Sequence, residues 1–132
     1  MNYKVTFTQK PGFLHAIVTG QNTKENVQGY LQDVLRECMA RQCPRVLIEE
    51  RLEGPRLGPL DVFTIASQGS DRVEGKLKAI AYVDVNAEGS LMKFAENVAV
   101  NRWLRVALFP TISAAETWLA QTISAETEPP RS

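Results

Sequence analysis

Apolar and polar positions change their period several times along the chain. Residues 3–8 alternate, which predicts a half-buried strand at the edge of a sheet. Residues 13–20 are apolar at nearly every position and predict an interior strand. Between them, Pro11 and Gly12 form a pair that is typical of a tight turn. The chain is therefore expected to open with an antiparallel hairpin.

After this hairpin, amphipathic runs alternate with short apolar runs, as in proteins built around a parallel sheet. The expected elements are a helix after Asn22 or Thr23, a strand over 45–50, a helix over 60–69, a strand within 76–85, a helix within 90–103, a strand within 104–110 and a helix over 113–120. The predicted fold class is α/β, in the order β-β-α-β-α-β-α-β-α. It has a mixed five-stranded sheet, antiparallel at first and then parallel, with about four helices and right-handed crossovers.

Helix ends and inner faces follow from spacing. Asn22 with Glu25, and Ser113 with Glu116, are spaced as capping boxes. Apolar side chains recur at helical spacing in the first helix, which predicts its buried face as Val27, Tyr30, Leu31, Val34, Leu35, Cys38 and Met39.

The bulk composition narrows the class of protein. With 132 residues the chain is expected to form one domain over 1–123, followed by a polar, disordered tail over 124–132. Fifteen basic and fifteen acidic residues cancel, which argues against a nucleic-acid binder and favours self-association. The sequence has neither an apolar signal core nor a run long enough to span a bilayer, so we expect a cytoplasmic protein without integral membrane association.

Candidate chemistry is sparse. Glu49, Glu50 and Asp84 end predicted parallel strands, where carboxylates can converge to hold a metal or to transfer protons. The competing interpretation, which we favour, is solvated strand-end charges paired with Arg51, Arg56 or Lys78. The single histidine, His15, is expected to be a hydrogen-bonded structural residue. We therefore predict no catalytic residues, no metal and no cofactor.

The two cysteines do not form a redox motif. Cys38 falls on the apolar side of the first helix and Cys43 follows its end, at a spacing other than CxxC. We expect two packed, free thiols.

The element order resembles a known family, and the local match is best in FAENVAVNRWLRVALFPTISAAETWLA (94–120), which ends with Ala115, Trp118 and Leu119. The chain resembles the STAS domain of bacterial anti-sigma-factor antagonists, and most closely its SpoIIAA-like branch. This resemblance implies a non-enzymatic regulatory module that binds a protein partner. The branch also resembles SEC14-type lipid-binding domains, which implies the alternative of a carrier or sensor of an apolar small molecule or lipid.

One feature of that family is missing. In anti-sigma-factor antagonists a phosphorylatable serine opens the helix after the third strand. The matching residues 53–61, EGPRLGPLD, contain no hydroxyl, and the first one downstream is Thr64. The serine switch is therefore not expected in this chain.

The loop over 51–59 and the helix after it are the best candidates for contact with a partner or ligand. Apolar side chains flank a Gly-Pro-Arg turn there, beside a helix N-terminus. The candidate residues are Leu52, Arg56, Leu57, Leu60 and Phe63. Alternatively, Leu52 and Leu57 fold back under the loop. Surplus apolar positions in the second and third predicted helices, such as Val62, Ile65 and Met92, further suggest a homodimer.

Overall fold

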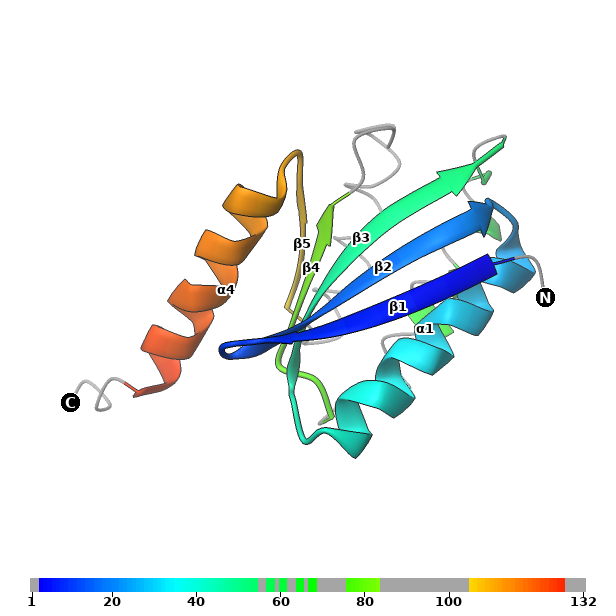
Figure 1. Ribbon diagram of the computed structural model, residues 1–132. Helices are drawn as coiled ribbons and strands as arrows, with labels where there is room; N and C mark the ends of the chain where they lie inside the picture. The colour runs from blue at the N-terminus through cyan, green and yellow to red at the C-terminus, as the bar shows by residue number, and fades with distance from the viewer. Residues whose placement is uncertain are drawn as a thin grey trace.

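The computed structural model describes residues 3–54, 57–58, 60–61, 64–65, 67–68, 76–83 and 105–127, with side chains as far as residue 123. Five strands form one sheet (Figure 1). They are β1 (Tyr3–Lys10), β2 (Phe13–Gln21), β3 (Arg45–Glu53), β4 (Ala79–Val83) and β5 (Val106–Phe109). Two helices have defined bounds, α1 (Lys24–Ala40) and α4 (Ile112–Thr127).

The strands lie in the sheet in their chain order, β1-β2-β3-β4-β5. β1 and β2 are antiparallel, and every later pair is parallel. The hairpin turns at Pro11 and Gly12, whose φ of 85° is the left-handed value that the third position of a type II turn requires. The predicted mixed sheet, with an antiparallel hairpin followed by parallel strands, is confirmed.

β3 is longer than the sequence pattern indicated. We expected a loop from residue 51, but β3 continues to Glu53 and stays in register with β2, so that Gly20 lies opposite Leu52. The pairing partner provides the hydrogen bonds that extend the strand, and nothing in the local sequence reveals it.

Thr23 caps the start of α1, and its hydroxyl accepts a hydrogen bond from the backbone N–H of Asn26 at 3.1 Å. Thr23 was one of the two predicted caps, and the capping box at Asn22 is not the one used. The predicted inner face is confirmed at its centre, where the buried side chains are Val27, Tyr30, Val34 and Cys38. Met39 is instead 51% exposed, because it lies beyond the edge of the buried stripe that ends at Cys38 in the same turn of α1.

The two faces of the sheet carry separate cores. β2, β3 and β4 are parallel and lie side by side in chain order. Right-handed connections between such strands all lie on the same face of the sheet. Leu57 and Ile65, from the connection after β3, accordingly pack against the same buried cluster as α1. α4 covers the opposite face, where its Ala115 and Leu119 meet Leu47 and the alanines of β4.

α4 starts one residue before the predicted capping box. The Thr111 hydroxyl, rather than Ser113, accepts a hydrogen bond from the Ala114 amide at 3.2 Å. α4 also continues to Thr127, so the predicted domain end at residue 123 falls within a helix. Only residues 128–132 of the predicted tail lie outside the described part of the chain.

The number of helices differs from the prediction of about four. The described residues contain two helices with defined bounds. Helical backbone is present at residues 60, 61, 64, 65, 67 and 68, within the helix that we expected over 60–69. The helix expected over 90–103 lies outside the described residues. Neither α1 nor α4 combines the length and the apolar character that a membrane crossing needs.

Candidate interaction site

The predicted contact residues separate into buried and exposed ones. Leu52 is buried on β3, and Leu57 is half-buried against the core beneath α1. Both therefore fold back under the loop, as our alternative interpretation proposed. Leu60 is 77% exposed. Arg56 and Phe63 lie outside the described residues.

Leu60 stands on a segment that is held against the first half of α1. Lys24 of α1 forms an ion pair with Asp61, with Nζ and Oδ1 3.9 Å apart. The Gln28 side-chain amide donates to the Gln68 side chain at 3.1 Å. Together with Leu60 these residues form what we call the Leu60 surface: Lys24, Gln28, Leu60, Asp61 and Gln68.

The carboxyl end of β3 helps to position this surface. At the carboxyl end of β3, the backbone N–H of Asn22 donates to the Glu53 carbonyl at 2.7 Å, which connects the segment before α1 to the end of the strand. Gly54 follows with a φ of 107°, a conformation that residues with a side chain rarely adopt. The chain therefore leaves the sheet at a defined point and returns alongside α1.

Of the carboxylates that were candidates for catalysis, the two that the structure describes, Glu49 and Glu50, do not converge. Successive residues of a strand point to opposite faces of a sheet, and Glu49 and Glu50 do so here. Glu49 lies on the α4 face, where its Oε1 is 3.1 Å from Nε2 of His15 and its other oxygen pairs with Arg51. Its side chain is only 7% exposed. The predicted pairing with Arg51 is confirmed, as is the hydrogen-bonded role of His15, but the expectation that Glu49 is a solvated charge is wrong, because the residue is buried. Asp84 lies outside the described residues.

Glu50 lies on the α1 face, in a polar cluster that the sequence pattern did not indicate. The fully buried Tyr30 donates its hydroxyl hydrogen to Glu50, and its oxygen is 3.2 Å from the Tyr82 hydroxyl. Burial and the Glu50 charge raise the pKa of Tyr30 well above 10.0. Tyr30 therefore remains a neutral donor, and its hydroxyl joins α1 to Glu50 of β3 and Tyr82 of β4. The three residues are distant in sequence, so only their pairing in the sheet brings them together.

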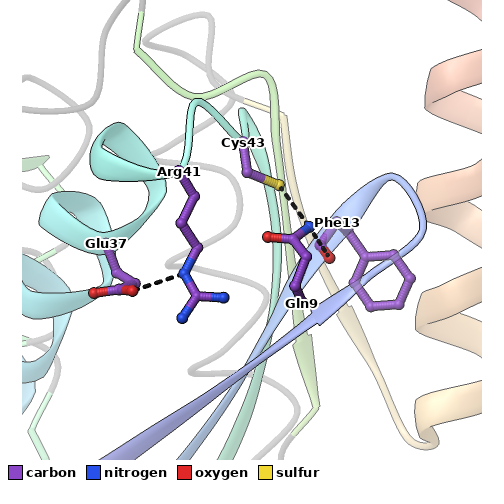
Figure 2. A network of polar contacts seen from close by, with 5 residues as sticks. All are labelled: Gln9, Phe13, Glu37, Arg41 and Cys43. Atoms are coloured by element: carbon purple, nitrogen blue, oxygen red, sulfur yellow. Dashed lines mark hydrogen bonds and ion pairs between the residues drawn. The ribbon is translucent and has the colours of Figure 1, made fainter.

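At the opposite end of the sheet, polar contacts connect the β1–β2 turn with the end of α1 (Figure 2). The Gln9 side-chain amide donates to the Phe13 carbonyl at 3.2 Å and approaches the Cys43 sulfur at 3.8 Å. The nearby pair of Arg41 and Glu37 closes the last turn of α1 at 2.7 Å. These contacts hold the β1–β2 turn against the residues that follow α1, and we assign them no binding role.

The two cysteines are free and buried, as predicted. Burial raises the pKa of the Cys38 thiol to about 12, so it stays protonated and unreactive at neutral pH. Among the described residues no group of three or more His, Cys, Asp or Glu side chains could hold a metal ion.

Comparison with known proteins identifies the fold. No protein-family model and no curated protein matches the sequence. The structure is similar to the crystal structure of an anti-sigma factor antagonist from Mycobacterium paratuberculosis, with a TM-score of 0.53 and 13% sequence identity, over 89% of this chain and 94% of that one. The fold is therefore that of the STAS domain, and the resemblance inferred from the sequence is confirmed at the level of the fold.

Proposed function

We propose that this protein is a non-enzymatic, STAS-like regulatory module that binds a protein partner through the Leu60 surface. The observation that carries the proposal is the 77% exposure of Leu60 on a segment that α1 holds in place. The similarity to an anti-sigma factor antagonist supports a binding role rather than a catalytic one.

The surface has the composition of a contact site. An exposed leucine supplies apolar area, and the surrounding Lys24, Asp61 and glutamines supply a polar rim that hydrogen-bonds when water is excluded. Because Leu57 and Ile65 anchor the segment in the core, ordering it costs little on binding.

Site-specific photo-crosslinking tests this proposal. A photoreactive phenylalanine replaces Leu60 in one variant and Met39 in the other, since these are the two exposed large hydrophobic residues of the described chain. We expect a discrete protein adduct in the source cells from position 60 and none from position 39. The same adducts from both positions, or none from position 60, would contradict the proposal.

The identified partner then allows a quantitative comparison. Leu60→Glu should weaken binding by at least about tenfold, because it places a charge in the contact, whereas Met39→Glu should leave the affinity unchanged. Equal affinities for both variants would argue against the Leu60 surface.

The alternative of an apolar ligand stays a prediction. Native mass spectrometry of the protein purified from its source would reveal a co-purified lipid or other small apolar molecule. A cytoplasmic location also stays a prediction.

A further inference from the structure

β1 is a long, regular strand at the open edge of the sheet. Of the described strands only β2 pairs with it, over all eight residues and without a bulge (Figure 1). It contains no proline, one of the features that keep natural edge strands from pairing with another chain. The edge strand at the other side, β5, has only four residues.

The register of the hairpin determines which backbone groups of β1 are free to pair. Lys10 lies opposite Phe13 across a two-residue turn, and such flanking residues exchange hydrogen bonds with each other. Along β1 the bonding alternates, so Thr8 and Thr6 also direct their backbone groups to β2. The N–H and C=O groups of Tyr3, Val5, Phe7 and Gln9 therefore point away from the sheet.

The side chains of β1 are also incompletely covered. Tyr3, Val5 and Phe7 pack against the core beneath α1, but each is only half-buried. On the opposite face Lys4, Thr6 and Thr8 are exposed, since α4 packs over β3, β4 and β5 rather than over β1. A strand added to this edge would extend both the hydrogen bonds and the apolar face.

We propose that the occupant of this edge is a second copy of the chain, whose β1 pairs antiparallel with the first across a two-fold axis at Thr6. Directly opposite residues of antiparallel strands share a face, so only registers that pair odd with odd and even with even residues are allowed. The axis at Thr6 is one of these. It places Val5 opposite the partner's Phe7 and Lys4 opposite the partner's Thr8.

This register is favoured over its neighbours by side-chain chemistry. A shift of the axis to Phe7 would put Lys4 opposite the partner's Lys10, and like charges directly opposite destabilise a sheet. A shift to Val5 would pair only the first few residues of the strand. The axis at Thr6 puts Val5 opposite Phe7 and the two Thr6 side chains opposite each other, leaves no like charges directly opposite, and forms about eight new backbone hydrogen bonds. The zero net charge of the chain adds no long-range repulsion.

Cysteine crosslinking tests both the dimer and its register. In the proposed dimer the two copies of residue 6 form a non-hydrogen-bonded pair with Cα atoms about 4.5 Å apart, within reach of a disulfide. The two copies of residue 8 are displaced by four residues, or roughly 13 Å along the strand, and cannot be bridged. Thr6 and Thr8 are both exposed, so Thr6→Cys and Thr8→Cys form a matched pair.

Under mild oxidation Thr6→Cys should become mostly a covalent dimer, and Thr8→Cys should stay monomeric. Circular dichroism of both variants checks that each is folded. No crosslinking of a folded Thr6→Cys variant, or equal crosslinking of both variants, would overturn the proposal.

Sedimentation equilibrium provides an independent test without new thiols. Thr6→Lys brings two lysines together at the axis and should raise the dimer dissociation constant at least about tenfold. Gln32→Lys adds the same charge at an exposed position of α1 and should leave the constant unchanged. A monomeric wild-type protein at about 100 μM, far above the dissociation constants of ordinary stable dimers, would also overturn the proposal. The Leu60 surface and its crosslinking test do not depend on this result.

Discussion

Arg45 shows how a charged residue at the start of a strand becomes part of a core. It is buried under α4, where its Nε donates to the Thr122 hydroxyl at 3.0 Å and its Nη2 approaches the Thr122 carbonyl at 3.4 Å. The Thr122 hydroxyl in turn donates to the Leu119 carbonyl at 2.7 Å. One guanidinium therefore connects the first residue of β3 to the second half of α4.

Replacing Arg45 should be costly because the Thr122 oxygens would stay buried without these donors. Hydrogen bonds to a charged group contribute roughly 1.5–3 kcal/mol, and we expect Arg45→Met to lower the free energy of unfolding by about that amount. Urea denaturation measures this loss. Arg36→Met is the control, since the Arg36 side chain is 76% exposed and its removal should cost under about 0.5 kcal/mol. Equal losses for both variants would show that the Arg45 contacts do not stabilise the fold.

The raised pKa of Tyr30 should make the free energy of unfolding depend on pH in the alkaline range. The pKa of Tyr30 is higher in the folded chain than the ordinary 10.0, so folding favours its neutral form. The stabilisation is complete below pH 10 and is lost as the pH rises toward the folded pKa. We expect the free energy of unfolding to fall above pH 10, and less steeply in Tyr30→Phe. Urea titrations from neutral pH to about pH 11 test this, and identical slopes would contradict it.

At the scale of the elements, α4 is attached to the sheet mainly through two fully buried side chains. Ala115 and Leu119 are fully buried against the sheet, whereas Trp118 is half-buried and meets the Phe109 ring with centroids 5.5 Å apart. Trp118 thus packs against the same core, but Leu119 is more deeply buried than Trp118.

Leu119→Ala should therefore destabilise the protein by about 2.5–5 kcal/mol, the range for a leucine removed from a closed core. Trp118→Ala should cost less, because the indole is already partly in water. Chemical denaturation of the two variants ranks them. A larger loss for Trp118→Ala would show that its packing on Phe109 dominates the docking of α4.

β1 should be less protected than the central strands in the dilute protein. It pairs on one side only, and its apolar residues are half-buried. We expect the amides of residues 3–8 to exchange faster than those of 46–48 and 79–82, which lie in central strands. Native-state hydrogen exchange measures this order. The best protection over residues 3–8 at low concentration would contradict the topology described.

At the scale of the whole molecule, the fold is similar to that of an anti-sigma factor antagonist, whereas residues 53–61 contain no hydroxyl. The nearest one, on Thr64, is half-buried and donates to the Leu60 carbonyl at 3.0 Å. Phosphorylation requires an accessible hydroxyl and adds charge. We expect no phosphate within residues 53–64 after incubation with a kinase of the anti-sigma type. Mass spectrometry tests this, and a phosphate on Thr64 that abolishes partner binding would contradict it.

Much of the architecture could be predicted because it depends on local patterns. The alternation of β1, the turn at Pro11 and Gly12 and the helical spacing from Val27 to Cys38 are set by period and turn chemistry. These patterns are also sufficient for the order of elements and hence for the resemblance to the STAS domain. They failed at boundaries, at the end of β3 and at both ends of α4, where hydrogen bonds to a neighbouring strand or cap decide the limits.

The sequence by itself determined the fold class, the hairpin, the free thiols and the lack of a hydroxyl within residues 53–61, since each depends on residues close together in the chain. Only the tertiary structure decided which face of the sheet each of Glu49 and Glu50 takes, because residues on both faces of β3 are buried and the pattern does not distinguish the faces. It also decided that Leu52 and Leu57 are covered while Leu60 is exposed. The exposure of a loop residue depends on which distant surface its neighbours pack against, and here that surface is the core beneath α1.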